Sequence, residues 1–443
     1  MTRLFGTDGV RGLAGSDLTN ELARKLGRAA VVALTVAGTA HPRVLVGRDT
    51  RGSGGSLEAA LSEGIRSAGG DALLAGVLPT PAVAFLVAEL GTDAGAVISA
   101  SHNPAEYNGI KFLSSQGFKL ADALEDEIER LVAADDGGAQ GGPVGKVSRL
   151  PEPWRPYEEH IAESAGSLGG LSVVVDCANG AAWRVGPEAL RRLGADVIPI
   201  HDAPDGSNIN AVCGAMHPEV VAKAVVEHGA DAGVAFDGDA DRAIFADADG
   251  ALVDGDQVLA AAALDLHARG ELARDTVVTT VMANLGFRQA MERAGIHVRE
   301  TKVGDRYVLE EMLKSGAVLG GEQSGHLIFL RYATTGDGVL TAAKFLGLAT
   351  EHRRTVAELA SVMERLPQVL VNVEVGDREG LAKAAPVWEA VRVAEQAMDG
   401  SGRVLVRPSG TELLVRVMVE ATTEDEARRH ADAVARVVAS SLG

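Results

Sequence analysis

Aromatic residues, cysteines and long apolar runs are all scarce in this sequence of 443 residues. Only 4% of the residues are aromatic, and Cys177 and Cys213 are the two cysteines. The longest apolar stretches, such as 258–264, fall far short of the roughly 20 residues that a membrane-spanning helix needs. The first residues run straight into glycine and aspartate without a signal-peptide pattern. We therefore expect a cytoplasmic protein without a membrane partner, whose cysteines stay reduced.

Basic residues are outnumbered as well. The 42 lysines and arginines face 61 aspartates and glutamates, which gives a net charge of −19. This excess argues against nucleic acid as a partner, because phosphate backbones bind basic surfaces. An anionic substrate would require a local cluster of arginines, so the placement of the arginines matters.

Two familiar catalytic signatures are missing. The sequence has no G-x-x-x-x-G-K-[ST], which excludes a P-loop enzyme, and no G-x-S-x-G around Ser101, which excludes the hydrolase nucleophile elbow. His102 is next to Ser101, and neighbouring side chains on an extended chain point apart. The sequence therefore predicts that His102 is a poor base for Ser101.

Three stretches share one layout. Each has a β-branched run, a polar or glycine-bearing loop and a helical segment rich in Ala, Leu and Arg; they begin "RVLVGRDTRG", "LSVVVDCANG" and "TVVTTVMANL". Each helical segment closes at a glycine, Gly69, Gly194 or Gly295, the expected left-handed terminator. Alternating strands and helices predict right-handed βαβ units with mostly parallel sheets.

The predicted fold class is α/β: three similar mixed α/β domains plus a smaller C-terminal α+β domain around a central cleft. Glycine- and proline-rich or pattern-changing segments give the expected boundaries 1–150, 151–250, 251–365 and 366–443. The last domain shows two strand-like runs joined by "PSGTE" and then a helix, for which Thr423 and Glu426 fit a capping box.

The segment "VAFDGDADRAIF" places Asp237, Asp239 and Asp241 at alternate positions between two apolar runs. Three carboxylates this close repel each other and need a cation or extensive solvation. An EF-hand is excluded, because Arg242 and Ala248 stand where its glycine and glutamate belong. A solvated acidic turn is the alternative, but the position at a strand end favours a ligand site. Oxygen-only ligands favour Mg²⁺ over Zn²⁺.

Two further turns carry chemistry. "LGGEQSGHLIF" offers Glu322, Gln323, Ser324 and His326 as mixed hydrogen-bonding groups that suit sugar hydroxyls, although a plain turn is an equal alternative. "VRPSGTELLVRV" has a spacing typical of a helix cap, but the residues after it are β-like. We therefore interpret it as an oxyanion cradle, formed by Arg407, Ser409, Gly410, Thr411 and Arg416.

Four ordered motifs, "ISASHNPxxxNGIKF", "DGDADR", "GGEQSGH" and "RPSGTE", make the whole chain similar to the α-D-phosphohexomutase superfamily. "FGTDGVRG", "TKVGDRYVLE" and Gln323 resemble its bacterial branch that acts on glucosamine phosphates. Relatives that act on mannose and glucose phosphates typically have methionine at the position of Gln323. One departure is Leu413, where the superfamily usually has proline, which alters the stiffness of that loop.

The resemblance implies a role for each motif. Ser101 matches the phosphoserine that carries the phosphoryl group, and its phosphate shares Mg²⁺ with Asp237, Asp239 and Asp241. Glu322 and Ser324 match the residues that read sugar hydroxyls. The residues implied around the reacting phosphate are Arg11, Lys111 and Arg242. The residues implied to bind the distal phosphate, the one that is not being transferred, are Arg407, Ser409, Gly410, Thr411 and Arg416. The general base is left open between Lys111 and His326.

The implied reaction interconverts glucosamine 6-phosphate and glucosamine 1-phosphate. Phosphorylated Ser101 donates its group to the C1 hydroxyl, and the resulting glucosamine 1,6-bisphosphate turns over and returns the other phosphate. The product would feed UDP-N-acetylglucosamine and cell-wall precursors, a hexose 1,6-bisphosphate would serve as primer, and a monomer or homodimer is expected. The alternatives are a phosphomannomutase/phosphoglucomutase, a Mg²⁺-dependent sugar phosphatase and an inactive sugar-phosphate sensor.

Overall fold

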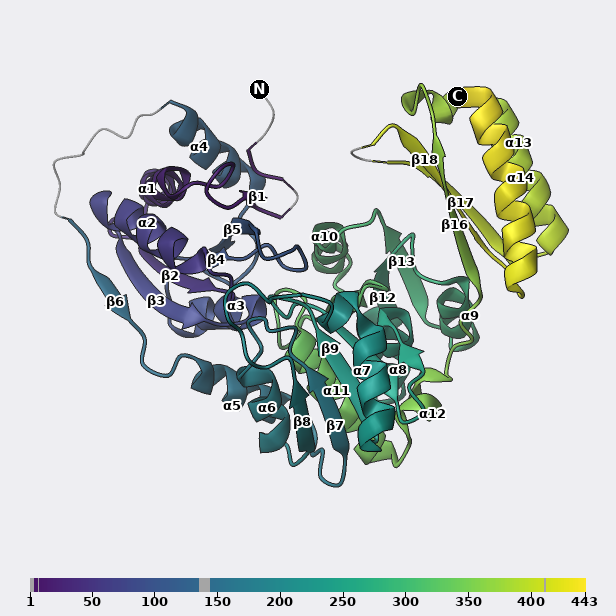
Figure 1. Cartoon of the computed structure of the whole chain (residues 1–443), viewed down its shortest axis with the longest axis horizontal. Helices are drawn as coiled ribbons and strands as arrows, with labels where there is room; N and C mark the ends of the chain where they lie inside the picture. Colours follow the sequence, from purple (N-terminus) through teal and green to yellow (C-terminus); the bar gives the residue numbers. More distant parts are fainter. Residues whose placement is uncertain (1–3, 7, 135–143, 410–411) are drawn as a thin grey trace. The chain divides into compact units, whose positions relative to one another are not determined.

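The computed structural model describes residues 4–6, 8–134, 144–409 and 412–443 (Figure 1). The chain divides into two compact units, one formed by 1–282 with 296–362 and the other by 283–295 with 363–443. The first unit contains three mixed sheets with flanking helices, and the second contains a smaller antiparallel sheet with helices. The predicted α/β class is therefore confirmed. No helix in the described part of the chain is long and apolar enough to cross a bilayer.

The first sheet has six strands. Their order is β1 (Val10–Leu13), β5 (Tyr107–Ser114), β4 (Ala94–Ile98), β2 (Arg43–Arg48), β3 (Asp71–Val77) and β6 (Val147–Arg149). The last four are parallel, whereas β5 runs antiparallel to β1 and β4. One face packs against α1 (Asn20–Val36), α2 (Gly54–Ser67) and α4 (Asp122–Ala133). Helix α3 (Thr80–Glu89) packs against β2 and β4, where Gly47 and Gly95 leave room for its valines.

The second sheet has the order β11 (Leu252–Val253), β10 (Ala243–Asp247), β9 (Ala232–Phe236), β7 (Ser172–Asp176) and β8 (Asp196–Ile200). Strands β7, β8 and β9 are parallel and β10 is antiparallel to β9. The segments of this part of the chain that matter below are α5 (Trp154–Ser164), α6 (Val185–Arg192), the short 3-10 helix η1 (Gly214–Met216) and α7 (Pro218–His228).

The third sheet has the order β13 (His297–Thr301), β12 (Thr276–Thr280), β14 (Leu319–Gly321) and β15 (Leu327–Phe329). Strand β12 is parallel to β13 and β14, and β14 forms an antiparallel hairpin with β15. The helices of this region within the first unit are α8 (Gly255–Ala268), α10 (Asp305–Ser315), α11 (Gly338–His352) and α12 (Val356–Ala360).

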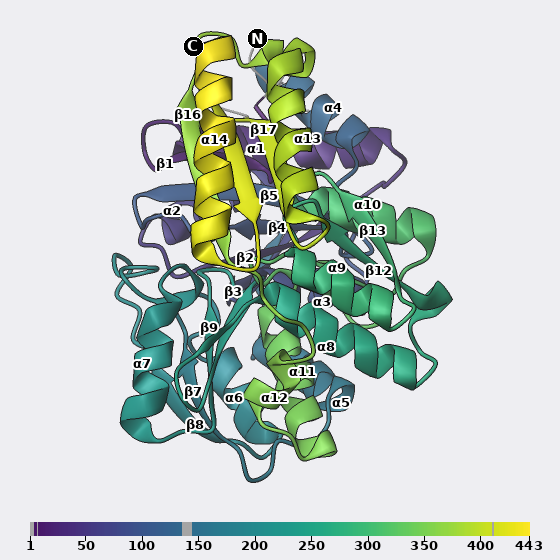
Figure 2. The same ribbon diagram turned by 90° about the vertical axis from the view of Figure 1, so that its right-hand side faces the viewer.

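In the second unit an antiparallel sheet of β16 (Gln368–Glu374), β18 (Leu414–Glu420) and β17 (Arg403–Pro408) packs against α13 (Ala385–Met398) and α14 (Glu424–Leu442). Figure 2 shows both helices in front of this sheet. Helix α9 (Leu285–Arg293) belongs to the same unit, because the carboxylate of Glu420 accepts from the backbone N–H of Leu285 at 2.9 Å and from Arg403 Nε at 2.6 Å.

Helix ends follow the sequence closely. Gly69, Gly194 and Gly295 have φ values of +89°, +100° and +73° just after α2, α6 and α9, so the predicted left-handed terminators are confirmed. Thr423 caps α14 by accepting from the N–H of Glu426 at 3.2 Å. The reciprocal half of the predicted capping box does not form, because the Glu426 carboxylate accepts instead from the Thr422 hydroxyl at 2.9 Å.

Helices α1 and α2 cross at a reciprocal pair of glycines. A Cβ on Gly27 would lie 2.2 Å from the carbonyl oxygen of Leu61, and a Cβ on Gly64 would lie 2.0 Å from that of Arg24. Each helix thus packs against the other's backbone, which only a residue without a side chain allows.

We expect Gly64→Ala to lower the free energy of unfolding by about 1–3 kcal/mol, because the added methyl group separates two packed helices. Gly55→Ala, in the first turn of the same helix, is the matched control, because a Cβ there meets nothing within 4 Å. Urea unfolding of both variants checks this. Equal stability of the two variants would contradict the packing argument.

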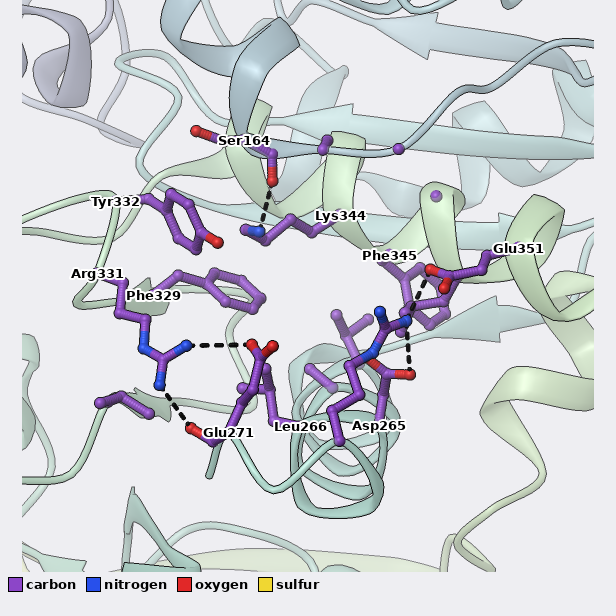
Figure 3. Close-up of a pocket in the computed structure, with 18 residues that line it drawn as sticks. Ser164, Asp265, Leu266, Glu271, Phe329, Arg331, Tyr332, Lys344, Phe345 and Glu351 are labelled. Carbon is purple, nitrogen blue, oxygen red and sulfur yellow. Dashed lines mark hydrogen bonds and ion pairs between the residues drawn. The ribbon is translucent and has the colours of Figure 1, made fainter. Parts of the chain in front are cut away.

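A cavity of about 240 Å³ in the first unit is lined by residues of α8 and α11, with the end of α5 and the end of β15 (Figure 3). Lys344 donates to the carbonyl oxygen of Ser164 at 2.6 Å, and its Nζ lies 3.7 Å from the centre of the Tyr332 ring. Among the described residues no carboxylate forms an ion pair with Lys344. Burial therefore lowers the pKa of Lys344 to about 8.

This pKa predicts a pH dependence of stability. Between pH 8 and 10.5 the unfolded chain keeps the lysine proton that the folded chain has lost, so the free energy of unfolding rises with pH in this window. The difference between wild type and Lys344→Met should therefore shift in favour of wild type from pH 7 to pH 10. Urea unfolding across this range measures it. Lys223→Met, whose side chain is 77% exposed on α7, is the control and should give a constant difference.

Candidate active site

Ser101 lies three residues beyond β4, inside a tight loop. Its side chain is buried, and its Oγ donates to Asp237 Oδ2 at 2.6 Å, while its backbone N–H donates to Ser99 Oγ at 3.0 Å. Its φ of +50° places it in the left-handed region, which a non-glycine residue occupies only when its surroundings hold it there. The loop after β4 of the first sheet thus meets the loop after β9 of the second sheet.

The orientation expected for His102 was wrong, whereas its assignment as a poor base for Ser101 stays a prediction. Its Nδ1 lies 3.3 Å from Ser101 Oγ, because the left-handed backbone of Ser101 turns the two neighbouring side chains towards each other. Burial, together with the charges of Arg242 and Arg11, lowers the pKa of His102 to about 4. A neutral imidazole therefore lies beside the serine oxygen at neutral pH.

Asp237, Asp239 and Asp241 form a buried acidic triad in the loop between β9 and β10. One oxygen of each lies within 4.8 Å of the other two. Asp239 Oδ2 accepts from Thr80 Oγ1 at 2.5 Å and from Lys111 Nζ at 3.0 Å. The remaining oxygens, Oδ1 of Asp239 and of Asp241, are buried without a hydrogen-bond partner among the described residues. Such orphaned carboxylate oxygens fit a hard divalent cation, so the triad could bind one.

The three carboxyl groups of the triad have pKa values shifted in different directions. Burial and the neighbouring aspartates raise the pKa of Asp237 well above its ordinary value, and burial with the charge of Asp239 raises the pKa of Asp241 to about 6. Burial is the largest single effect on Asp239 and acts in the same direction, but the charge of Lys111 and the hydrogen bonds from Thr80 and Lys111 together outweigh it and lower the pKa of Asp239 below its ordinary value. Without a bound ion the three carboxylates repel each other, and a cation would relieve this repulsion.

Three basic residues surround the triad. Lys111 on β5 pairs with Asp239 and lies 3.7 Å from Asp8, and Arg11 on β1 forms a short ion pair with Asp8. Arg242 donates its backbone N–H to Asp237 Oδ1 at 3.2 Å, and its Nε lies 3.7 Å from Asp241. Burial alone would lower the pKa of Lys111, but the charges of Asp239 and Asp8 raise it above its ordinary value. Lys111 is therefore a lasting ammonium.

The turn between β14 and β15 carries the predicted sugar-contact residues. Glu322 is buried and accepts from the N–H of Gly304 at 3.0 Å, whereas Ser324 is exposed. His326 is buried, and its Nε2 accepts from the N–H of Gly336 at 3.2 Å. This bond assigns the imidazole proton to Nδ1, which is buried without a partner among the described residues. The same turn joins the triad loop, because Ala243 N–H donates to the carbonyl oxygen of Gly325.

A cavity of about 190 Å³ adjoins these groups within the first unit. Residues from the loops of all three sheets line it, among them Asp8, Thr80, Lys111, Asp241, Arg306 and His326. The predicted basic residue, metal ligand and sugar-loop histidine therefore line one space.

The predicted phosphate cradle lies in the second unit. Arg407 on β17 and Arg416 on β18 are directly opposite each other in the sheet, on the face away from α13 and α14. Burial and the charge of Arg416 lower the pKa of Arg407. Ser409 is buried and its Oγ accepts from the N–H of Glu412 at 3.3 Å, without a helix following. Gly410 and Thr411 lie outside the described residues.

Several residues of the site escaped sequence reasoning. Arg51, fully buried, donates to the carbonyl oxygens of Ser101 at 2.9 Å and Asn103 at 2.7 Å, as well as to those of Pro104 and Tyr107. Its Nε pairs with Asp49 at 2.9 Å, and Asp49 accepts from Ser99 Oγ at 2.6 Å. The only signal was "GRDTRG" directly after a predicted strand.

Asn210, Thr80 and Asp8 were missed for a different reason. Asn210 Nδ2 reaches across from the second sheet to the carbonyl oxygens of Ser101 and Asn103 at 2.9 and 3.1 Å. Asn210 and Thr80 bind partners far away in the chain, which no local pattern in the sequence marks. Asp8 lies in the quoted segment "FGTDGVRG" and pairs with Arg11, but its second partner, Lys111, is distant in the chain.

Comparison with known families matches all four parts of the chain. The models for phosphoglucomutase/phosphomannomutase α/β/α domains I, II and III match residues 2–138, 155–250 and 254–366, and the model for the C-terminal domain matches 370–437.

Curated relatives extend over the full length. A phosphoglucosamine mutase of Symbiobacterium thermophilum is 53% identical, with all of both chains covered, and one of Thermobifida fusca is 54% identical, with 100% of this chain and 99% of the relative covered. Among solved structures, a phosphoglucomutase/phosphomannomutase family protein of Burkholderia thailandensis has a TM-score of 0.84 at 25% identity, covering 100% of this chain and 98% of the other.

An N-acetylphosphoglucosamine mutase of Aspergillus fumigatus, solved with GlcNAc-6P and magnesium, shares the fold with a TM-score of 0.69 at 19% identity, and the match covers 99% of this chain and 96% of that one. The four domain matches and the full-length relatives agree with the superfamily that the sequence motifs indicated. This chain therefore belongs to the phosphoglucomutase/phosphomannomutase family of α-D-phosphohexomutases.

Proposed function

We propose that the chain is a phosphoglucosamine mutase, which interconverts glucosamine 6-phosphate and glucosamine 1-phosphate through phosphorylated Ser101. The observation that carries this proposal is the buried Ser101 hydroxyl, 2.6 Å from Asp237 in an acidic triad in which Oδ1 of Asp239 and of Asp241 lack partners among the described residues. The names of the full-length relatives support glucosamine as the sugar. Gln323 in the sugar loop supports the same choice.

Asp237, Asp239 and Asp241 would hold Mg²⁺, since three buried carboxylates offer oxygen ligands only. When bound there, the ion would offset the negative charge of the triad and polarise the phosphoryl group on Ser101. The carboxylates themselves need this partner, because a phosphoserine dianion next to three aspartates is otherwise strongly disfavoured.

In the first transfer, the bond between phosphorus and Ser101 Oγ breaks while a new bond forms to the C1 oxygen of glucosamine 6-phosphate, and the proton that the C1 hydroxyl loses is gained by the leaving Ser101 oxygen. Arg11, Lys111 and Arg242 would neutralise the transferring group, which is the main demand of phosphoryl transfer. Lys111, held as an ammonium, would stabilise the negative charge on the leaving serine oxygen without giving up its proton.

His326 has a different assignment. With its Nε2 occupied by the N–H of Gly336, it carries its proton on Nδ1, a buried donor without a partner among the described residues, and is not arranged as a base. We therefore propose that His326 orients the substrate. Glu322 and Ser324 would bind the sugar hydroxyls.

The distal phosphate falls to the second unit. Arg407 and Arg416 face each other as like charges on neighbouring strands, and Glu412, 3.3 Å from Arg416, is the carboxylate that pairs with Arg416 among the described residues. An anion between the two guanidinium groups would offset their repulsion. We propose that they bind the non-reacting phosphate of either ester, together with Ser409, Gly410 and Thr411. Because the 1,6-bisphosphate must present each phosphate in turn to Ser101, this cradle has to accept both ends of the sugar.

The test is a coupled assay of glucosamine 6-phosphate isomerisation with a hexose 1,6-bisphosphate primer. We expect Mg²⁺-dependent turnover that a chelator abolishes, and loss of at least about 10³-fold in Ser101→Ala, because the group that is transferred has no carrier. Intact mass should show one phosphate on the wild type and none on the variant.

Side products separate the alternatives. Net release of inorganic phosphate would indicate a phosphatase, and faster turnover of glucose or mannose 6-phosphate would indicate a phosphoglucomutase/phosphomannomutase. Full activity of Ser101→Ala would overturn the proposal.

Another prediction concerns Arg51. We propose that it positions the Ser101 loop through its hydrogen bonds to four backbone carbonyl oxygens. Arg51→Lys keeps the charge next to Asp49 but cannot reach four carbonyl oxygens, so kcat should fall about 10²-fold through misplacement of the serine. The KM for glucosamine 6-phosphate should change little, because the sugar loop is untouched. Arg48→Lys, at the last residue of β2 and three residues before Arg51, is the control. A change in KM alone, or loss of stability with unchanged kcat in the folded fraction, would contradict positioning.

A further inference from the structure

Asp176, His201 and Cys213 form a second cluster of metal-ligating side chains, separate from the acidic triad. One donor atom of each lies within 4.8 Å of the other two. Asp176 is the last residue of β7, His201 follows the last residue of the parallel strand β8, and Cys213 directly precedes η1. The carboxyl ends of parallel strands are where α/β sheets place their ligands.

The backbone holds these three residues firmly. The N–H of Asn179 donates to the carbonyl oxygen of His201 at 2.7 Å, and the N–H of Gly214 donates to Asp176 Oδ2 at 2.9 Å. Gly214 has a φ of +72°, and a Cβ there would lie 2.4 Å from the carbonyl oxygen of Phe236. The segment that carries Cys213 is therefore locked against the end of β9.

The donor types select a different ion from that of the acidic triad. A thiolate sulfur, an imidazole nitrogen and a carboxylate oxygen are together typical of zinc, which takes four tetrahedral ligands. His201 Nδ1 lies 3.1 Å from Asp176 Oδ1. Two ligands about 2.1 Å from a tetrahedral zinc are separated by about 3.4 Å, so a small adjustment admits the ion between them.

The sulfur of Cys213 is available as a third ligand, besides Asp176 and His201. It forms no disulfide, and no described residue hydrogen-bonds to its sulfur, whereas the sulfur of Cys177 lies 3.8 Å from the carbonyl oxygen of Val175. The His201 side chain is 34% exposed, so the cluster has a path to solvent through which an ion and a fourth, water ligand can enter.

We propose that Asp176, His201 and Cys213 bind a zinc ion that fixes the segment 201–214. On binding, the sulfur–hydrogen bond of Cys213 breaks, a sulfur–zinc bond forms and the proton leaves to solvent. The fixed segment carries Asn210, which donates to the carbonyl oxygens of Ser101 and Asn103. The ion therefore has a structural role, in holding the segment that supports the serine loop.

Cobalt(II) is the probe that tests this site, with excess Mg²⁺ present to occupy the acidic triad. Wild type should take up one equivalent with a thiolate-to-cobalt charge-transfer band in the near ultraviolet, which the oxygen ligands of the triad cannot produce. Cys213→Ser should lose the band. Cys177→Ser is the matched control and should keep it, because the sequence contains only these two cysteines.

Zinc retention by a variant of His201, a half-exposed residue, gives an independent test of the site. His201→Asn tolerates the left-handed backbone of this residue, whose φ is +47°, and should weaken zinc binding at least about 10-fold in equilibrium dialysis. His228→Asn, at the end of α7, should not change it. Zinc should also raise the Tm of wild type and of Cys177→Ser but not of Cys213→Ser.

Absence of the charge-transfer band in wild type would overturn the proposal. So would a band that disappears in Cys177→Ser and persists in Cys213→Ser, or zinc retention that is unchanged in His201→Asn. The last measurement decides the question even where Cys213→Ser fails to fold.

Discussion

The burial of three carboxylates beside one hydroxyl is the constraint on which the rest of this site depends. Asp237, Asp239 and Asp241 repel each other while buried, and two cations lie close to them: Lys111, 3.0 Å from Asp239, and Arg242, 3.7 Å from Asp241. These cations leave Oδ1 of Asp239 and of Asp241 without hydrogen-bond partners among the described residues, next to the loop of Ser101. A divalent cation bound to these oxygens would relieve the repulsion, so the instability of the empty triad would contribute to its affinity for the ion.

Holding Ser101 in that place requires support from two sheets. Arg51, which pairs with Asp49 after β2 of the first sheet, donates to the carbonyl oxygen of Ser101. Asn210, after β8 of the second sheet, donates to the same carbonyl oxygen. These bonds offset the cost of a left-handed serine, and they also turn His102 towards it. If zinc binds next to Cys213, the support from the second sheet gains a fixed anchor of its own.

Sequence reasoning found what local patterns encode. The glycine-terminated helices, the aspartates after β9 and the sugar turn between β14 and β15 all lie where alternating patterns predicted them. It failed for the orientation of the His102 side chain, because the positive φ of Ser101 is imposed by distant residues, and for the second half of the Thr423 cap, because Thr422 competes for the Glu426 carboxylate. Arg51 was missed because its partners are backbone carbonyl oxygens. Every residue has such an oxygen, so no sequence motif indicates which ones Arg51 contacts.

The acidic composition of the chain is compatible with a phosphorylated substrate because charge acts locally. Ordinary surface charges are screened within about 10 Å at physiological salt, so a net charge of −19 spread over 443 residues has little influence on a cradle of opposed guanidiniums. Strand register places Arg407 opposite Arg416, and the burial of Arg407 strengthens their repulsion. The cradle would therefore favour an anion for the same physical reason that the triad would favour a cation, because each places like charges next to each other and the nearby ion pairs, Arg416 with Glu412 and Lys111 with Asp239, engage only some of those charges.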